Sequence, residues 1–257
     1  MAKREGWHGW DTYAAFYDWE NARTLGRRDV AFWRRTLREE QARTLELGCG
    51  TGRLLMPMAR AGIPMVGIDR SPDMLTRAVD RARKLPRASR PAILRGDIRT
   101  LPFSARSFGA VMAPYGLFQS LLRESDLSML LAEVHRVLRK GGLFGIDLVP
   151  DLPAWHEYNE QVSLRGRGPR GGQLTLVESV RQDRRRKLTI FDEVFVERIG
   201  TRTTRHAFSL TFRTLALPEV VERVAEAGFV VERLLGDYRG GRWTDDSDVW
   251  FIVARRK

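Results

Sequence analysis

Short apolar runs alternate with helix-like stretches between residues 43 and 150. The runs are only a few residues long and end at Gly, Asp or Pro, which is typical of buried parallel strands. They cover residues 44–47, 65–68, 92–94, 108–112 and 143–148. Between them, apolar residues at helical spacing predict helices over residues 53–61, 72–85 and 127–138. Because strand–helix–strand connections are right-handed, this order predicts a parallel sheet with helices on both faces.

The pattern changes after Pro150. Apolar and polar residues alternate with a period of two over residues 173–180, 188–199 and 205–215. Such alternation predicts a small antiparallel sheet with one face in water. The basic run at 184–187 falls between two of these strands, and we interpret it as a hairpin tip rather than a binding patch. The Gly- and Arg-rich stretch 165–172 is the one segment that resembles a flexible linker.

The two ends of the chain add further elements. Residues 7–40 are aromatic-rich, and we expect them to be helical. Near the other end, Pro218 opens a helix that Gly228 closes. Strands are predicted after it, over residues 229–235 and 249–254.

The composition fits one large folded unit. The chain has 257 residues, of which 43% are apolar and 30% charged, so it can bury a core and is not a disordered polymer. No apolar run reaches the roughly 18 residues of a membrane span, and the first residues lack the apolar stretch of a signal peptide. We therefore expect a cytoplasmic protein without membrane contact. The single cysteine, Cys49, excludes an internal disulfide and a cysteine-cluster metal site, and we expect no metal.

The net charge is only weak evidence for binding to nucleic acid. Lys and Arg number 44 against 32 acidic residues, a net charge of +12, which favours contact with polyanions. Only five of the basic residues are lysines, as a compositional preference for arginine across a whole proteome would produce. The charge alone therefore does not establish nucleic-acid binding.

The most informative stretch covers residues 45–53, where the first strand turns into the first helix. Its glycines at 48, 50 and 52 let the backbone turn sharply and approach a ligand closely. The following helix N-terminus offers free N–H groups. Asp69 stands at the end of the second strand, where a carboxylate can accept hydrogen bonds from two ribose hydroxyls. The alternative is a tight turn that binds no ligand. The order of strand, glycines, helix, second strand and terminal acid instead favours a nucleoside-bearing cofactor.

Two residues argue against a dinucleotide. The dinucleotide fingerprint G-x-G-x-x-G/A needs a third small residue, and here Arg53 occupies that position. Glu46, two residues before the first glycine, would repel a pyrophosphate. A ligand with a ribose, an adenine and a cationic amino-acid end would tolerate that carboxylate.

These residues resemble the class I S-adenosylmethionine-dependent methyltransferases. Residues 46–52, 67–75 and 96–103 match the first three motifs of that family, while 108–115 and 138–142 look like the fourth motif and the turn before the fifth strand. The resemblance is close over residues 43–150. It implies an α/β fold: a doubly wound, Rossmann-like seven-stranded sheet, mostly parallel with the last strand antiparallel, and a small antiparallel β insertion. It also implies S-adenosylmethionine as cofactor and S-adenosylhomocysteine as product.

The resemblance further implies four segments. Residues 1–42 would form an N-terminal helical lid and 43–150 the cofactor-binding core. Residues 151–216 would form the antiparallel insertion over the active site, and 217–257 a helix and strand hairpin that complete the core sheet. The insertion could serve as a roof over the acceptor or as a dimer contact, and a monomer and a homodimer both remain open.

Carried over by position, the resemblance implies a set of cofactor contacts. Gly48, Gly50 and Gly52 would line the methionyl part, and Asp69 would hold the ribose. Met74 and Arg70 would flank the adenine, while Asp97 and the Ile98 amide would read its edge. The set also includes Tyr17, Glu46, Cys49 and Pro114. The alternatives are that Met74 is ordinary helix core and Asp97 a turn former; Cys49 is expected to be a small spacer rather than a nucleophile.

Residues 13–18 resemble the tyrosine-rich lid helix of small-molecule methyltransferases, with Tyr17 placed over the cofactor. An aromatic ring near a sulfonium is physically sensible, because the cation is attracted to the electron-rich face. The alternative is that these aromatic residues only pack the helix down.

Methyl transfer from a sulfonium is an in-line displacement, so the enzyme mainly aligns the acceptor and excludes water. A base is necessary only where the acceptor must lose a proton. The catalytic candidates are Tyr17, Tyr115 at the end of the fourth strand, and His156 after the fifth, on the edge where open α/β sheets bind ligands.

The leading interpretation is therefore a methyltransferase that acts on an amine or hydroxyl of a small metabolite. One alternative is an RNA methyltransferase for tRNA or rRNA, which the charge favours and the lack of an RNA-binding module disfavours. The other is a non-catalytic protein that binds the cofactor.

Overall fold

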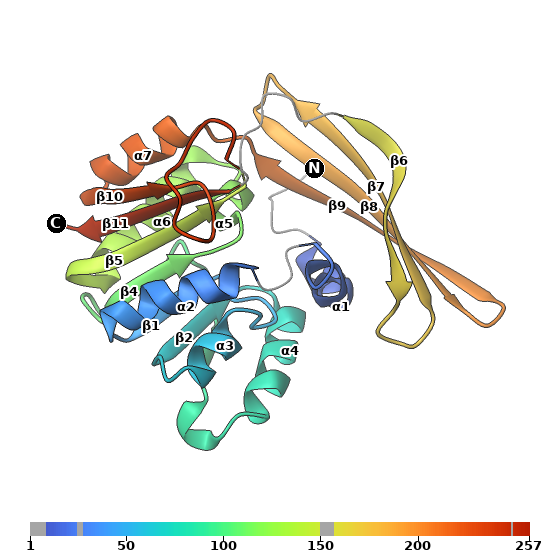
Figure 1. The fold of residues 1–257 in the computed structure, drawn as a ribbon, viewed down its shortest axis with the longest axis horizontal. Helices are drawn as coiled ribbons and strands as arrows, with labels where there is room; N and C mark the ends of the chain where they lie inside the picture. The colour runs from blue at the N-terminus through green and yellow to red at the C-terminus, as the bar shows by residue number, and fades with distance from the viewer. Residues whose placement is uncertain (1–8, 25–27, 150–156, 248) are drawn as a thin grey trace.

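The fold consists of a large mixed sheet flanked by helices and a separate antiparallel sheet (Figure 1). The computed structural model describes residues 9–24, 28–149, 157–247 and 249–257. The large sheet has seven strands in the order β10-β11-β5-β4-β1-β2-β3. Their bounds are β1 Thr44–Leu47, β2 Met65–Asp69, β3 Ala92–Arg95, β4 Phe108–Ala113, β5 Leu138–Leu148, β10 Phe229–Leu235 and β11 Trp250–Arg256. Only β11 runs against its neighbours, so the predicted fold class is confirmed.

Helices cover both faces of this sheet. On one face lie α2 (Arg28–Glu40), α3 (Leu55–Arg60) and α4 (Pro72–Arg83), and on the other α6 (Glu124–Val137) and α7 (Leu217–Glu226). The short helix α5 (Leu117–Ser120) follows β4, and a 3₁₀ turn, η1 (Arg87–Ser89), precedes β3. Every residue of β1 and β4 is buried, because both faces of a central parallel strand are covered. Within the described ranges, no helix is long and apolar enough to cross a membrane.

The strand order positions the site. From β1 the chain moves to β2 on one side, and it later returns to β4 on the other side. The crevice at the carboxyl ends of β1 and β4 is therefore the switch point where open α/β sheets bind ligands.

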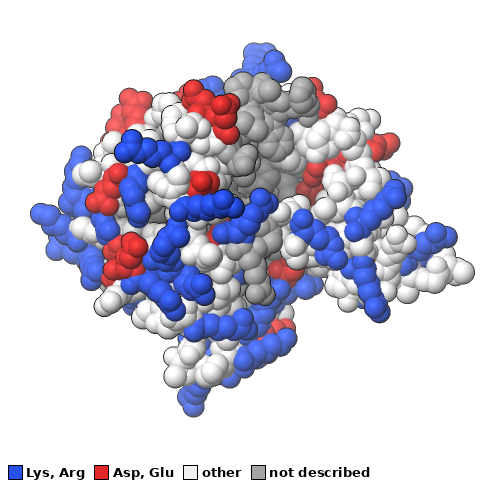
Figure 2. Space-filling model, in the orientation of Figure 1, with Lys and Arg blue, Asp and Glu red and all other residues white. Residues whose placement is uncertain are grey.

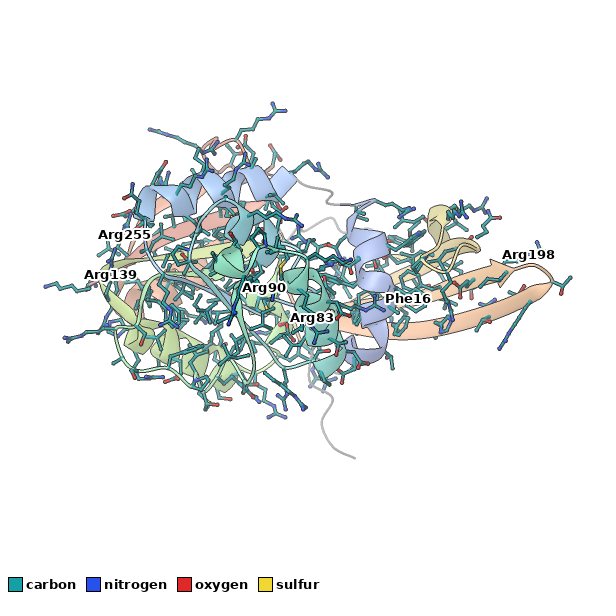
Figure 3. The ribbon with its side chains drawn as sticks, turned by 90° about the horizontal axis from the view of Figure 1, so that it is seen from below. Phe16, Arg83, Arg90, Arg139, Arg198 and Arg255 are labelled. Atoms are coloured by element: carbon teal, nitrogen blue, oxygen red, sulfur yellow. The ribbon has the colours of Figure 1, made fainter. Side chains whose placement is uncertain are left out.

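The second sheet is antiparallel and has four strands in sequence order: β6 (Tyr158–Arg167), β7 (Gln173–Asp183), β8 (Leu188–Ile199) and β9 (Arg202–Arg213). Its apolar face packs on helix α1 (Trp10–Asn21), which lies between the two sheets (Figure 1). The Phe16 ring points from α1 toward this sheet and stacks on Phe195 with centroids 4.5 Å apart (Figure 3). Most of the described residues before the core thus lie in helices α1 and α2, as predicted.

Two local predictions were wrong, the linker and the turn before the fifth strand, while one strand was not predicted and one helix starts earlier than predicted. The stretch 165–172 is not a linker, because it holds the end of β6 and the turn into β7, where the Gly168 amide donates to the Gly172 carbonyl at 2.7 Å. Strand β6 escaped prediction because it is an exposed edge strand without apolar alternation. Helix α6 starts at Glu124, and the stretch after Val137 is already part of β5, not a turn. The basic run at 184–187 does form a hairpin tip, as predicted.

Candidate functional site

A cleft of about 1290 Å³ lies among the carboxyl ends of the core strands, helix α1 and the inner face of the four-stranded sheet. Most of the residues predicted from the sequence line it: Tyr17, Glu46, Gly48, Cys49, Gly50, Asp69, Arg70, Met74, Asp97, Ile98, Pro114 and Tyr115. Gly52 does not line it; a Cβ there would come within 2.8 Å of Met56 Cε, so this glycine serves packing at the start of α3. His156 lies outside the described residues.

The glycine loop leaves one open cradle. Gly50 has φ of +53°, and a Cβ added to it would meet nothing closer than 3.9 Å, where Gly48 O and Met74 Sδ lie. A side chain here would therefore project into the cleft and occupy space that a ligand could use. The neighbouring Cys49 is buried, and burial raises the pKa of its thiol well above the usual value. A thiol that stays protonated fits a spacer better than a nucleophile.

Asp69 ties the glycine loop to helix α4. Its Oδ2 accepts a hydrogen bond from the Gly50 amide at 2.8 Å, and its Oδ1 accepts one from the Ser71 amide at 2.8 Å. Burial raises the pKa of Asp69, while these amides lower it. A carboxylate has about four lone-pair positions, so it can still accept from two hydroxyls.

Asp97 has partners of its own. Its carboxylate accepts from the Arg99 side chain at 2.7 and 3.0 Å and pairs with Arg70 at 3.2 Å. The Arg99 guanidinium holds the pKa of Asp97 below its usual range. An adenine amino group that donates a hydrogen bond to this carboxylate would compete with both arginines. Ile98 lines the cleft beside it.

Glu46 has one carboxylate oxygen without a hydrogen-bond partner. It is only 2% exposed, and its Oε2 has no hydrogen bond in the structure. Burial raises the pKa of Glu46 well above its usual value, although the charge of Arg53 lowers it. An orphaned acid in the cleft wall is suited to a cationic group.

Arg53 lies in the cleft wall close to Tyr17 and Tyr115. It makes a bidentate pair with the buried Asp29 at 2.9 and 2.6 Å, and its guanidinium lies 5.4 Å from the Tyr115 ring centroid. Burial raises the pKa of Tyr17 to about 12 and also raises that of Tyr115. Both phenols therefore favour the protonated form near neutral pH, and both line the cleft. Tyr115 also has a positive φ of 55°, a backbone strain found often at functional sites.

Helix α1 is anchored to the loops that follow β1 and β2. Asp18 accepts a hydrogen bond from the Thr51 hydroxyl at 2.7 Å and pairs with Arg81 at 2.6 Å. Asp11 accepts from the Ser71 hydroxyl at 2.5 Å. The helix therefore connects the loops after β1 and β2 with the four-stranded sheet, the position that a lid requires.

The opposite side of the cleft carries three acids that the sequence analysis missed: Glu20 of α1, Glu178 of β7 and Glu193 of β8. We call them the acidic wall. Glu178 and Glu193 face each other directly across the two strands. Tyr13 donates a hydrogen bond to Glu20, and Tyr158 donates one to Glu178.

Glu193 is the most deeply buried of the three. It is 3% exposed, and its Oε2 has no hydrogen-bond partner. Burial, together with the charges of Glu20 and Glu178, raises the pKa of Glu193 to about 9. Burial also raises the pKa of Glu20 to about 7, against the hydrogen bond from Tyr13, which lowers it.

The alternation of apolar and polar residues along β7 and β8 already marked two of these acids as unusual. On β7, Glu178 stands in the apolar phase between Leu176 and Val180. On β8, Glu193 stands between Phe191 and Phe195. A charged residue in the buried phase of an amphipathic strand is the pattern that could have identified them.

The comparisons with known proteins identify the core. Residues 44–142 match the family model of a methyltransferase domain, and they contain the glycine loop, Asp69 and Tyr115. The chain thus carries a class I S-adenosylmethionine-dependent methyltransferase domain. The resemblance predicted from the motifs is confirmed.

Relatives of this methyltransferase domain act on different acceptors. Over 143 residues the chain is 27% identical to the sterol 24-C-methyltransferase of Debaryomyces hansenii, covering 55% of this chain and 37% of the relative. Over 142 residues it is 33% identical to the glycine/sarcosine N-methyltransferase of Parasynechococcus marenigrum, covering 53% and 48%. The chain therefore matches less than half the length of either relative.

The fold is shared over nearly the whole chain. The sugar N-methyltransferase KedS8 from a Streptoalloteichus species superimposes with a TM-score of 0.75, covering 94% of this chain and 93% of that one. At 19% identity, this likeness concerns the fold alone.

The residues present fit the cofactor of the methyltransferase domain. S-adenosylmethionine supplies an electrophilic methyl group on a sulfonium. The open cradle at Gly50 leaves space for a chain that lies close to the backbone. The unpartnered carboxylate oxygen of Glu46 suits the cationic group of this cofactor, and the carboxylate of Asp69 suits its ribose. Among the residues that the structure describes, no group of three His, Cys, Asp or Glu side chains is arranged to hold a metal ion.

Proposed function

We propose that this protein is an S-adenosylmethionine-dependent N-methyltransferase whose acceptor is a small molecule with an amine. The acidic wall carries this proposal, because it lines the same cleft as the glycine loop. Like charges directly opposite one another destabilise a sheet, and burying a carboxylate adds a desolvation cost. An ammonium group between these acids would offset both costs, whereas a neutral hydroxyl could donate a hydrogen bond but would leave the like charges without a counter-charge.

The size of the cleft is consistent with two ligands. Pockets for one drug-sized molecule measure roughly 300 to 1,000 Å³. At about 1290 Å³, this cleft has room for a nucleoside cofactor and a small acceptor together. Two of the similar proteins named above are N-methyltransferases, for glycine or sarcosine and for a sugar, while the third methylates a sterol carbon.

The test is a paired acceptor screen. The protein is incubated with S-adenosylmethionine and with amino sugars, amino acids and alkylamines, each matched by its hydroxyl analogue, and formation of S-adenosylhomocysteine is measured. We expect turnover with members of the amine series and none with their hydroxyl partners. Turnover with the hydroxyl series alone, or binding of S-adenosylhomocysteine without turnover of any amine, would overturn the proposal.

A further inference from the structure

We infer that Glu193 is the base that takes a proton from the acceptor's ammonium group before methyl transfer. This inference rests on the proposed N-methyltransferase function and goes beyond it, because it assigns a catalytic role to a residue of the inserted sheet. It also answers a question that the sequence left open, namely whether any side chain can accept a proton.

Among the three residues of the acidic wall, Glu193 is the one with a buried carboxylate oxygen that has no hydrogen-bond partner. On β7, Glu178 faces it and takes the phenol hydrogen bond of Tyr158; on β9, Phe208 faces it. On α1, the Tyr13 phenol donates to Glu20 and lies close enough to hydrogen-bond Glu193 as well. The Oε2 atom of Glu193 remains without a partner although the side chain lines the cleft.

Other candidate bases are less suitable. The raised pKa values of Tyr17 and Tyr115 keep both phenols protonated. His206 lies on the same face of β9, but it does not line the cleft and its ring packs 4.9 Å from Phe16. Glu20 accepts the hydrogen bond from Tyr13 and, unlike Glu193, has no buried oxygen without a partner.

A proton must leave because an ammonium nitrogen has no lone pair. One N–H bond breaks, and its proton moves to the free oxygen of Glu193. The nitrogen lone pair then forms the bond to the methyl carbon while the carbon–sulfur bond breaks and leaves its electron pair on sulfur. The methylated nitrogen carries the positive charge. Water later removes the proton from Glu193, so atoms and charges balance.

The environment of Glu193 suits this transfer. A carboxylate with an ordinary pKa near 4.3 is too weak a base for an alkylammonium, whose pKa is about 10.4 in lysine. Burial and the neighbouring acids raise the pKa of Glu193 to about 9. The raised pKa makes Glu193 a stronger base than an ordinary carboxylate, which favours proton transfer from the ammonium group.

The first test needs no acceptor. Sinefungin is an S-adenosylmethionine analogue with an amine in place of the sulfonium methyl, so its ammonium probes the reacting position. Calorimetry near pH 8, in buffers with different ionisation enthalpies, compares sinefungin with S-adenosylhomocysteine. We expect sinefungin to release about one more proton from the wild type, because its ammonium displaces the proton of Glu193. Glu193→Gln loses this difference, and equal proton release by both ligands in the wild type would overturn the inference.

The matched control is Asp192→Asn. Asp192 is the adjacent residue of β8, on the opposite face, and it pairs with Arg181 at 2.8 Å. This variant should keep the wild-type proton release and wild-type activity.

The second test separates kcat from KM with an amine identified by the acceptor screen. In the wild type, KM should fall about tenfold per pH unit between about pH 7 and 9 while kcat stays level, since binding displaces the proton of Glu193. In Glu193→Gln, kcat should be roughly 10²- to 10⁴-fold lower at pH 7 and should rise about tenfold per pH unit, because the bound ammonium must lose its proton to water. A loss of kcat by the same factor at every pH, or no loss, would contradict a role as base. If the wild type methylates no amine, the proposed function fails instead.

Discussion

Glu178 and Glu193 lie directly opposite one another on two antiparallel strands, on the face that packs toward helix α1. Cross-strand pairs on one face approach within about 5.5 Å at Cβ, so two carboxylates in this register repel each other. The sheet keeps this unfavourable pair beside apolar residues of the same face, among them Leu176, Phe195 and Leu210. A protein selected only for stability would fill both positions with apolar residues, and the pair therefore points to a bound cation.

The first prediction concerns stability without acceptor. In the folded chain the pKa of Glu193 is about 9, above its value near 4.3 when unfolded. The stability that this group contributes is complete below about pH 4.3 and is lost as the pH rises toward 9, by up to about 1.4 kcal/mol per pH unit. Glu193→Gln removes this loss. The variant should thus become more stable than the wild type as the pH increases from 5 to 9.

Urea unfolding at several pH values checks this difference, with Asp192→Asn as the control. A difference between Glu193→Gln and the wild type that stays constant with pH would show that Glu193 titrates normally in the fold.

The second prediction concerns the ribose. Asp69→Ala should weaken binding of S-adenosylhomocysteine at least about tenfold, because each hydrogen bond to a charged acceptor contributes roughly 1.5–3 kcal/mol. The substitution also removes the link from Gly50 to the start of α4. Calorimetry measures the affinity, and Asp73→Ala, which removes an exposed acid from the first turn of α4, is the control. Equal affinity of Asp69→Ala and the wild type would mean that the ribose lies elsewhere.

The third prediction concerns the glycine cradle. Gly50→Val should abolish binding of S-adenosylhomocysteine and leave a folded protein, since the side chain would project into the cleft. The control is Gly62→Val, which has the same backbone strain at φ of +83° but places its side chain in open space. Circular dichroism monitors the fold and calorimetry the binding. If both variants bind S-adenosylhomocysteine equally well, the ligand does not lie close to the Gly50 backbone.

The fourth prediction concerns nucleic acid. Lys and Arg are spread over both the core and the four-stranded sheet on the face seen in Figure 2, with acids among them. Several arginines are also paired, as Arg255 is with Glu40 at 2.7 Å. Binding driven by phosphate contacts weakens steeply with salt. The fluorescence anisotropy of labelled tRNA should therefore not increase when the protein is added at about 200 mM salt. Tight binding at that salt would favour the RNA methyltransferase alternative.

The core could be predicted from the sequence because its signals are local. The strand, glycine loop and helix around Gly50 are contiguous, and Asp69 follows in the next strand of the same unit. Strand β6 could not be predicted in this way, since an exposed edge strand needs no apolar alternation. The partners of Asp97 were also missed, because side-chain pairing with Arg99 depends on the turn geometry rather than on the motif.

The acidic wall illustrates the main limit of sequence reasoning. Each of its acids stands on a different element, and only the register of β7 against β8 brings Glu178 and Glu193 together. The position of α1 then adds Glu20. The alternation marked two of these residues as unusual, but their juxtaposition is a property of the tertiary fold.

Transfer of the methyl group to nitrogen can be tested directly on the product. Incubation with S-adenosylmethionine labelled with ¹³C in its methyl group, followed by carbon–proton NMR of the purified product, identifies the methylated atom directly. We expect a labelled carbon bonded to the acceptor's nitrogen. A label on oxygen, on carbon or on RNA would contradict it.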